Sequence, residues 1–348
     1  MENIELKTCS VKRAAWYFRL LASAWGVVYT AVVMDNVCFF GIDGGGTHSR
    51  IALTDYDGKI VAHAVSGSTN IYSVTEGEVF ENLSGLLDSV LETAGIRKKN
   101  LAAGCIGSAG LGREKEQKLF RGFFDTLLGS KFPVRMCTDG EILLCGGLTN
   151  LEGYCLIAGT GSIALGRSSS GTLIRSGGHG YMLGDEGSAA WIGKTAIARI
   201  LRSLEKRDLP TEMPAAILEA ACLDQCDDLI RYIHHDANKA KVAALAPVVT
   251  AAARNGDPLA LDILNAGAEE LALLVKSVLA QSPWIQCREL VLAGGVMEHN
   301  EIITGRLKGI LARESPELTV FPPKGTALEG ASMLALDLFK MNTQGSAG

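Results

Sequence analysis

The sequence has little excess charge of either sign and no run of like charges. Its 348 residues carry 33 Lys and Arg against 38 Asp and Glu, a formal net charge of −5. A nucleic-acid-binding domain usually shows a basic patch, and a polybasic tail would show as a block of like charges. Because neither is present, we expect a small-molecule partner and no nucleic acid.

Sets of paired metal ligands are also missing. The nine cysteines are scattered and odd in number, and most lie inside apolar runs. Cys222 and Cys226 stand four apart, but no second pair completes a zinc set, and none of the six histidines has ligand spacing. This usage is typical of small buried residues in a reducing compartment, so we expect a cytoplasmic protein.

The first 33 residues show only part of a targeting signal. Lys12 and Arg13 precede a largely apolar segment at 14–34, but no A-x-A cleavage site follows, and the uninterrupted apolar run is short for a membrane span. We interpret residues 1–33 as an N-terminal extension that stems from a wrongly placed start codon ahead of Met34. A membrane anchor or an added helix are the alternatives. For the main body we expect no membrane association.

Glycine, by contrast, is abundant, with 40 residues. The stretch at 39–53 reads FFGIDGGGTHSRIAL, an apolar strand followed by three glycines and a second apolar strand. The pattern predicts a β-hairpin with a glycine tip, whose backbone N–H groups can turn inward and form an anion site. Asp43, just before the tip, is placed to hold a divalent cation through water. Because a strand follows the glycines, the stretch is neither a P-loop nor a dinucleotide fingerprint.

The second half of the chain repeats this theme. Up to residue 148, strand and helix patterns follow the order β-β-β-α-β-α-β-α, which predicts a mixed sheet. A second glycine-tipped hairpin, at 153–166, opens the other half. We interpret the repeat as an internal duplication in which both tips hold one polyphosphate. Asp139 lies where a strand ends and a helix begins, so it is either a helix N-cap or a catalytic base.

After the second hairpin come a glycine-rich loop at 177–193, a mainly helical segment to 281, a strand at 289–293 and a last helix. We therefore divide the chain into an extension at 1–33, an N-terminal lobe at 34–148, a C-terminal lobe with a helical insertion at 149–330, and a C-terminal helix at 331–348 that packs back on the first lobe.

Five separated motifs carry a resemblance to known proteins. They are GIDGGGT at 41–47, TDG at 138–140, AGTGS at 158–162, AGGV at 293–296 and GTALEGA at 325–331. In this order they resemble the sugar kinase, Hsp70 and actin superfamily. The loop GGHGYMLGDEGSAAWIG, with SGSTN at 66–70 before it, is similar to the BadF/BadG/BcrA/BcrD-type ATPase family and, more narrowly, to N-acetylglucosamine kinases. The resemblance implies an α/β fold of two ribonuclease H-like lobes with a cleft between them, the actin-like ATPase fold.

The resemblance also implies roles for single residues. Those expected to bind ATP are Gly44, Gly45, Gly46, Thr47, Gly159, Thr160, Gly161 and Ser162 for the phosphates, and Gly294 and Gly295 for the adenosine. Those expected to contact the sugar are Asn70, Ser108, Gly178 and Asp185. Asp43 would orient hydrated Mg²⁺, and Asp139 would be the general base.

The implied activity is phosphoryl transfer from ATP to an amino sugar by a homodimer, with the 6-hydroxyl of N-acetylglucosamine as the expected acceptor. Two departures from the family pattern keep glucosamine, N-acetylmuramate and glucose open. Ser108-Ala109-Gly110 stands where the family has Ser-Gly-Gly, and Ile71-Tyr72 stands where it has a bulky aromatic pair.

Two other classes of protein are alternatives. An ATPase that activates a radical dehydratase or reductase needs paired cysteines for an iron–sulfur cluster, which the loop at 184–188 lacks. A sugar sensor without catalysis would not need the base Asp139.

Overall fold

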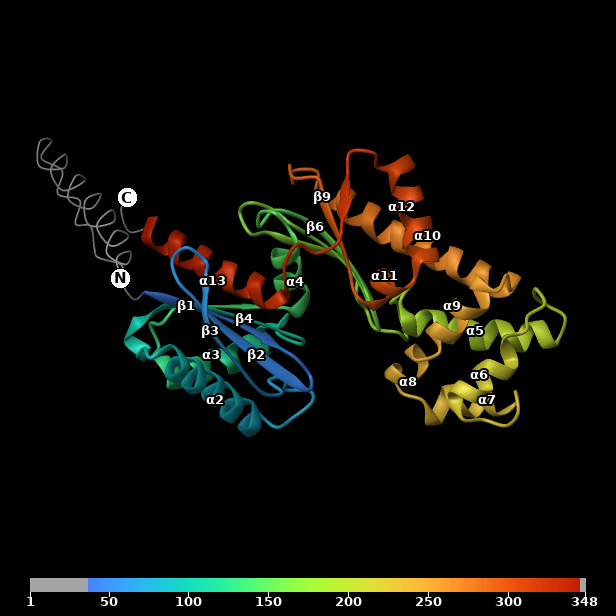
Figure 1. Cartoon of the computed structure of the whole chain (residues 1–348), viewed down its shortest axis with the longest axis horizontal. Coiled ribbons are helices and arrows are strands. Elements are labelled where there is room, and N and C mark those ends of the chain that lie inside the picture. The colour runs from blue at the N-terminus through green and yellow to red at the C-terminus, as the bar shows by residue number, and fades with distance from the viewer. Residues whose placement is uncertain (1–36, 345–348) are drawn as a thin grey trace, which may run out of the picture. The chain divides into compact units, whose positions relative to one another are not determined.

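The computed structural model of the chain describes residues 37–344. The extension expected at 1–33 therefore lies outside the described residues. Two lobes follow, each built on a five-stranded sheet with helices packed against it (Figure 1). This architecture confirms the predicted α/β class with two ribonuclease H-like lobes.

The first sheet has the strand order β3-β2-β1-β4-β5. The first three strands are antiparallel neighbours, whereas β4 and β5 join them in parallel. The elements of this lobe are β1 (Cys38–Gly44), β2 (His48–Thr54), β3 (Ile60–Gly67), α2 (Glu76–Ala94), η1 (Lys98–Asn100), β4 (Leu101–Ser108), α3 (Glu114–Leu128), β5 (Val134–Cys137) and α4 (Asp139–Gly147). Their sequence confirms the predicted β-β-β-α-β-α-β-α order.

The second sheet repeats the first. Its order, β8-β7-β6-β9-β10, has the same antiparallel and parallel pairings at corresponding places. Its strands are β6 (Gly153–Ala158), β7 (Ser162–Arg167), β8 (Leu173–Gly177), β9 (Glu289–Ala293) and β10 (Thr319–Phe321). This correspondence supports the interpretation that the chain arose by internal duplication.

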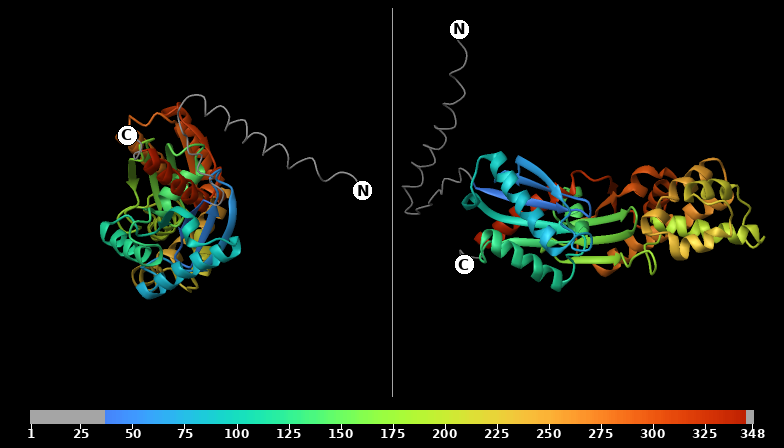
Figure 2. Two further views of the ribbon diagram at one scale, coloured as in Figure 1. Left: turned by 90° about the vertical axis from the view of Figure 1, so that its left-hand side faces the viewer. Right: turned by 90° about the horizontal axis from the view of Figure 1, so that it is seen from below.

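Helices fill the interval between β8 and β9 and follow the last strands. They are α5 (Ala189–Leu204), α6 (Met213–Ala221), α7 (Asp228–Arg231), η2 (Tyr232–Asp236), α8 (Lys239–Ala243), α9 (Ala246–Arg254), α10 (Pro258–Gln281), α11 (Gly295–His299), α12 (Glu301–Glu314) and α13 (Ala327–Gln344). Figure 2 shows the yellow and orange helices of the insertion gathered at one end of the second sheet.

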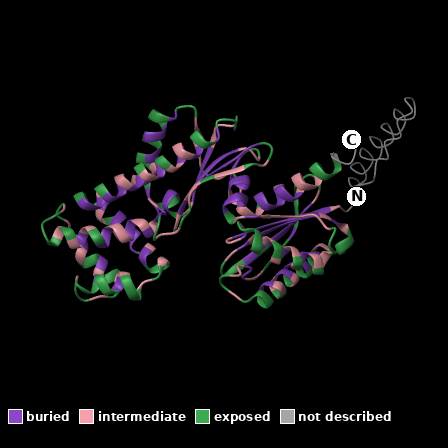
Figure 3. Cartoon of the chain, turned by 180° about the vertical axis from the view of Figure 1, so that it is seen from behind, coloured by how far each residue is buried: buried purple, intermediate pink, exposed green. Residues whose placement is uncertain are grey.

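Neighbouring residues of β1 show why this sheet is covered on both faces. The ring of Phe40 stacks on Phe124 of α3 at a centroid distance of 6.0 Å, and the ring of Phe39 meets Phe339 of α13 edge-on at 5.2 Å. Because successive side chains of a strand point to opposite faces, a continuous apolar run requires a cover on each side. In Figure 3 the central strands are accordingly buried, and the exposed residues lie mainly on helices and loops.

Polar residues in the sequence set the starts of the helices. Thr75 and Glu78 form a capping box at the start of α2. At the start of α4, the N–H of Glu141 donates to Oγ1 of Thr138 at 3.2 Å, so Thr138 is the N-cap. Asp139 is the first residue inside that helix, and the N-cap interpretation of Asp139 is therefore wrong.

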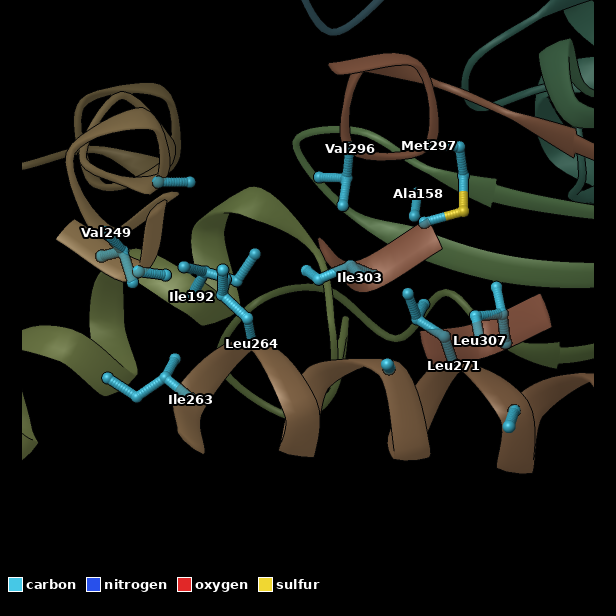
Figure 4. Close-up of a cluster of buried hydrophobic side chains, with 14 of the residues drawn as sticks. Ala158, Ile192, Val249, Ile263, Leu264, Leu271, Val296, Met297, Ile303 and Leu307 are labelled. Carbon is cyan, nitrogen blue, oxygen red and sulfur yellow. The ribbon is translucent and has the colours of Figure 1, made fainter. Parts of the chain in front are cut away.

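Apolar side chains from α5, α9, α10 and α12 pack together beneath the second sheet. Figure 4 shows part of this cluster, including Ile192, Leu264, Leu271, Ile303 and Leu307, all of them fully buried. Burial of each such side chain stabilises the fold by about 1.5–3 kcal/mol. The cluster holds α5 against the second sheet. Helix α5 and the loop before it belong to the site described below.

Two glycines allow α4 and α13 to cross in contact. A Cβ at Gly146 would collide with the carbonyl oxygen of Thr326, and one at Gly330 would collide with that of Ile142. Helix α13 also packs on β1, β2 and β4, so it covers a face of the first sheet.

The bounds that we predict for the lobes and for the extension stay a prediction.

Among residues 37–344, no helix is both long and apolar enough to cross a membrane. The described cysteines are all free, and five of them are buried: Cys38, Cys105, Cys137, Cys145 and Cys155. Their burial confirms that the chain uses most of its described cysteines as small interior residues.

Candidate functional site

The first glycine turn, residues 44–47, begins where β1 ends beside β4. The parallel pairing places Gly44 next to Ser108, the last residue of β4. A Cβ at Gly44 would lie 2.5 Å from Oγ1 of Thr69 and 2.9 Å from Oγ of Ser108, so a larger residue would displace both side chains. The turn expected to hold phosphate is thus in direct contact with a residue expected to hold sugar.

Hydroxyl groups fix the SGSTN loop against this turn. Oγ of Ser49 shares a 2.8 Å hydrogen bond with Oγ1 of Thr69, and both groups are buried. Ser68 donates to the carbonyl oxygen of Gly45 at 3.0 Å. The loop and the hairpin are therefore joined by hydrogen bonds at two places.

Asn70 and Tyr72 extend this loop toward α3. Oδ1 of Asn70 accepts the N–H of Tyr72 at 2.9 Å, and a Cβ at Gly46 would lie 3.9 Å from Nδ2 of Asn70. The hydroxyl of Tyr72 donates to Oε1 of Glu116 at 2.7 Å. This bond raises the pKa of Tyr72 and lowers the pKa of Glu116.

The hydroxyl of Ser108 is buried and has no hydrogen-bond partner among the described residues. Buried polar side chains in folded proteins nearly always have a partner. Ser108 therefore has an unused hydrogen-bonding group at the end of β4, as the expected sugar contact requires.

Asp43 pairs with a cation from the neighbouring strand. The antiparallel register sets it opposite Arg50, whose Nη2 lies 2.7 Å from Oδ2 of Asp43. Mg²⁺ is usually held by one or two carboxylates, several waters and the phosphates of a substrate. One carboxylate beside a turn that is expected to bind phosphate fits that arrangement. Residues 37–344 contain no group of three or more His, Cys, Asp or Glu that could hold a metal.

Asp139 is exposed at the head of α4. Its Oδ1 accepts the N–H of Gly140 at 2.9 Å. The surroundings are closely packed: a Cβ at Gly112 would lie 3.3 Å from Thr138, and one at Gly140 would lie 2.9 Å from Leu165 of β7. The start of α4 therefore contacts both the loop after β4 and a strand of the second sheet.

The second glycine turn, residues 159–162, is fastened to the start of α5. The carbonyl groups of Gly159 and Thr160 accept the N–H groups of Ala189 and Ala190 at 2.9 and 3.4 Å. These N–H groups belong to the first turn of the helix, which has no partners for them within the helix. The turn and α5 consequently hold each other in place.

Three further glycines named from the sequence border this turn. The N–H of Gly178 donates to the carbonyl oxygen of Ser162 at 3.0 Å. Gly294 has φ 95°, a value that favours glycine, and a Cβ there would lie 3.1 Å from the nitrogen of Gly159. A Cβ at Gly159 would in turn lie 3.8 Å from the nitrogen of Gly295.

The side chains of Asp185 and Lys239 lie against the second glycine turn at Gly161. A Cβ at Gly161 would lie 2.7 Å from Oδ2 of Asp185 and also 2.7 Å from Nζ of Lys239. The two charged atoms are themselves 2.7 Å apart. Asp185 is 3% exposed and has a left-handed backbone, φ 59°, which is uncommon for a residue other than glycine.

The structure thus gathers most of the sequence-predicted residues into two groups; Thr47 is the last residue of the first turn, and Asp139 lies apart at the start of α4. The first contains Asp43, Gly44, Gly45, Gly46, Asn70 and Ser108, and the second contains Gly159, Thr160, Gly161, Ser162, Gly178, Asp185, Gly294 and Gly295. Sequence reasoning missed Arg50, Thr69 and Lys239. Counting the hairpin register could have found Arg50 opposite Asp43, and Thr69 lies inside a quoted motif. No local pattern pointed to Lys239.

Comparison with known proteins agrees with this arrangement. A kinase of Clostridium acetobutylicum named for N-acetylmuramic acid and N-acetylglucosamine is 35% identical, over 85% of this chain and 97% of its own. The N-acetyl-D-glucosamine kinase of Dictyostelium discoideum is 29% identical, over 87% of this chain and 99% of its own. A crystal structure from Chromobacterium violaceum, provisionally named an N-acetylglucosamine kinase, has a TM-score of 0.66 at 26% identity, over 86% of this chain and 98% of that chain.

The family model for the BadF/BadG/BcrA/BcrD ATPases matches residues 40–335, which is most of the described chain. This match covers both glycine turns, Asp139 and the loop at 177–193. The resemblance seen in the sequence is confirmed, and the chain belongs to the BadF/BadG/BcrA/BcrD ATPase family.

Proposed function

We propose that this protein is an ATP-dependent amino-sugar kinase that phosphorylates the 6-hydroxyl of N-acetylglucosamine, with Asp139 as the general base. Its assignment as a sugar kinase follows from relatives that carry that activity in their names and align over most of the chain. The hydroxyl, the base and the individual sugar contacts are the parts that we infer.

One observation carries the proposal. In each lobe, the glycine turn expected to bind phosphate directly contacts a side chain expected to bind sugar: Gly44 contacts Ser108, and Gly161 contacts Asp185. Transfer of a phosphoryl group requires the acceptor hydroxyl and the phosphate to be held within about 3–3.5 Å. Turns that served separate ligands would not need this contact.

The residues have distinct tasks in the proposed mechanism. Backbone N–H groups of the two turns hold the phosphates, because phosphoryl transfer depends mainly on positioning and on neutralisation of charge. Ser108 and Asp185 orient the sugar, and Asp139 accepts the proton of the attacking hydroxyl. When bound near Asp43, Mg²⁺ supplies positive charge to the phosphate oxygens.

The choice of sugar follows from the names of the relatives and from the residues beside the sugar loop. Both kinases compared above are named for N-acetylglucosamine, and one of them also for N-acetylmuramic acid. Tyr72, which replaces the expected aromatic pair, is held by Glu116 beside the sugar loop. We therefore rank N-acetylglucosamine first, ahead of N-acetylmuramate, glucosamine and glucose.

A coupled assay for ADP release tests the proposal across these four sugars, with the phosphorylated carbon located by ³¹P and ¹H NMR of the product. We expect the highest kcat/KM for N-acetylglucosamine and phosphate on its 6-oxygen. ADP release that is independent of any sugar would contradict the kinase and favour an ATPase. The predicted homodimer can be checked by light scattering of the purified protein.

A further inference from the structure

We propose that Lys239 supplies the side-chain cation of the phosphoryl-transfer site, where its ammonium binds the terminal phosphate of ATP beside Gly161. The inference rests on the proposed function, in which residues 159–162 hold phosphates of ATP. It adds a charged side chain to a set of expected ATP ligands that consists of glycine, threonine and serine.

The position of the ammonium is the first observation. Nζ of Lys239 lies 2.7 Å from the place where a Cβ of Gly161 would stand, so it rests directly on the glycine turn. A phosphate cradled by this turn would lie within reach of the same ammonium. Lysine is a common phosphate ligand because its compact charge can donate three hydrogen bonds.

The state of Asp185 is the second observation. Its side chain is 3% exposed, and Oδ2 accepts no hydrogen bond from the described residues although Lys239 lies 2.7 Å away. The pair is therefore close but poorly aligned for hydrogen bonding. A buried carboxylate needs well-directed donors, which the hydroxyl groups of a sugar would provide. Lys239, 38% exposed, would then be free to turn toward the phosphate.

The fold provides a support common to Lys239 and the turn. Lys239 begins α8, which packs against α5, and the same α5 binds residues 159–162 through its first N–H groups. A Cβ at Gly193 of α5 would collide with the carbonyl oxygen of Val242, so glycine is what permits α8 to approach so closely. The buried side chain of Val242 anchors the short helix. The position of Lys239 is thus set by the packing of α8 against α5.

Nucleotide affinity tests the inference without depending on turnover. We would titrate the wild type, Lys239→Met and Lys239→Arg with ADP and with the non-hydrolysable analogue AMPPNP, each with Mg²⁺, by calorimetry. Loss of one charged hydrogen bond should weaken AMPPNP about 10- to 100-fold in Lys239→Met. The affinity for ADP, which lacks the terminal phosphate, should change less than about 2-fold. Lys239→Arg should keep most of the affinity for AMPPNP.

Lys241→Met is the matched control, because Lys241 lies on the same helix and donates to the carbonyl oxygen of Asp236. It should leave both affinities unchanged. Equal changes for ADP and AMPPNP in Lys239→Met, or no change, would overturn the inference. If Lys239→Met fails to fold because Asp185 loses its partner, the double variant with Asp185→Asn removes that charge and allows the same nucleotide comparison.

Two further outcomes separate this inference from others. A KM raised only for N-acetylmuramate, with AMPPNP affinity intact, would show that Lys239 binds the carboxylate of that sugar instead of the nucleotide. A wild type that phosphorylates no sugar, but binds AMPPNP through Lys239, would contradict the proposed function and leave the inference standing.

Discussion

Thr138, and not the neighbouring Asp139, is the N-cap of helix α4. Oγ1 of Thr138 accepts the N–H of Glu141 at 3.2 Å, the bond that an N-cap aspartate would otherwise make. The carboxylate of Asp139 is exposed and bonded to the N–H of Gly140. Thr138 therefore stabilises the start of α4, whereas Asp139 is free of that role and can act as the base that we propose.

The first prediction concerns Asp139. Asp139→Asn keeps the size of the side chain but removes the base, so kcat with N-acetylglucosamine should fall about 10²- to 10⁴-fold. Binding of ATP should persist, because the phosphates are held by other residues. Steady-state kinetics and calorimetry with AMPPNP check the two statements.

Thr138→Ala provides the contrast in stability. It should lower the free energy of unfolding by about 1 kcal/mol, whereas Asp139→Asn should change it by less than about 0.5 kcal/mol. Urea denaturation measures both. Near-normal turnover of Asp139→Asn would remove Asp139 from the mechanism.

The second prediction concerns Asp43 and the metal. Asp43→Asn replaces a charged oxygen ligand with a neutral one, so the Mg²⁺ concentration for half-maximal activity should rise by about 10-fold or more. A titration of activity with Mg²⁺ measures it, and chelation by EDTA should abolish activity.

Arg50→Met is the partner experiment for Asp43. It removes the cation that lies 2.7 Å from Oδ2 of Asp43 but keeps the carboxylate. Because Arg50 and Mg²⁺ would compete for this carboxylate, the Mg²⁺ requirement should fall or stay the same. A requirement that rises equally in both variants would mean that the ion pair, and not the carboxylate, is what the site needs.

Local patterns predicted the parts of the site that lie at the ends of strands. The glycine turns at 44–47 and 159–162 were visible because each interrupts an apolar strand, and Asp139 was visible because it follows one. The duplication was visible because both hairpins have the same layout. The matching strand orders of the two sheets support these interpretations.

Long-range contacts set the limit of what the sequence could predict. Lys239 lies 54 residues beyond its partner Asp185 in the sequence, within the helical insertion. The amphipathic pattern of these helices indicates which residues are buried, but it does not indicate which part of the fold an exposed side chain will reach. The place of Lys239 depends on the close approach of α5 and α8 at Gly193, which is decided by tertiary packing. The N-cap of α4 could not be predicted for another reason. Thr138 and Asp139 are adjacent and are both common N-cap residues, so only the three-dimensional structure shows that Thr138 has this role.

The third prediction tests the crossing of α4 and α13. In Gly330→Ala the new methyl group would collide with the backbone of Ile142, and backbone cannot move aside as a flexible side chain can. Overpacking of this kind should lower the free energy of unfolding by about 1–3 kcal/mol, or more where relaxation is blocked. Thermal or urea denaturation checks it.

Gly309→Ala is the control for the crossing. Gly309 lies inside α12, and a Cβ there would have no neighbour within 4 Å. Alanine is the better helix former, so this variant should gain up to about 1 kcal/mol of stability. A loss of similar size in Gly309→Ala would show that the loss in Gly330→Ala does not arise from the close contact between the two helices.

The fourth prediction is a pH dependence of stability at Asp208. Arg199 of α5 holds Asp208 with a 2.6 Å ion pair. The hydrogen bond from Arg199 is the main cause that keeps the pKa of Asp208 well below its usual value of 3.8. Because the folded-state pKa is the lower one, the contribution of Asp208 is complete above the unfolded-state value and is lost as pH falls through the folded-state value. Asp208→Asn should therefore destabilise the protein at pH 7, and the difference from wild type should shrink below about pH 4.

Asp88→Asn distinguishes this effect from a general response to acid. Asp88 is 61% exposed and lies 3.5 Å from Lys98, a surface pair of a kind that contributes little. Its removal should change stability by less than about 0.5 kcal/mol at neutral pH. Urea denaturation of wild type and both variants from about pH 7 down to about pH 2 gives the comparison, because the pKa of folded Asp208 lies well below 3.8. If the Asp208→Asn difference stayed constant over this range, the carboxylate would act through shape or hydrogen bonding alone, since a contribution from its ionisation must disappear with its charge.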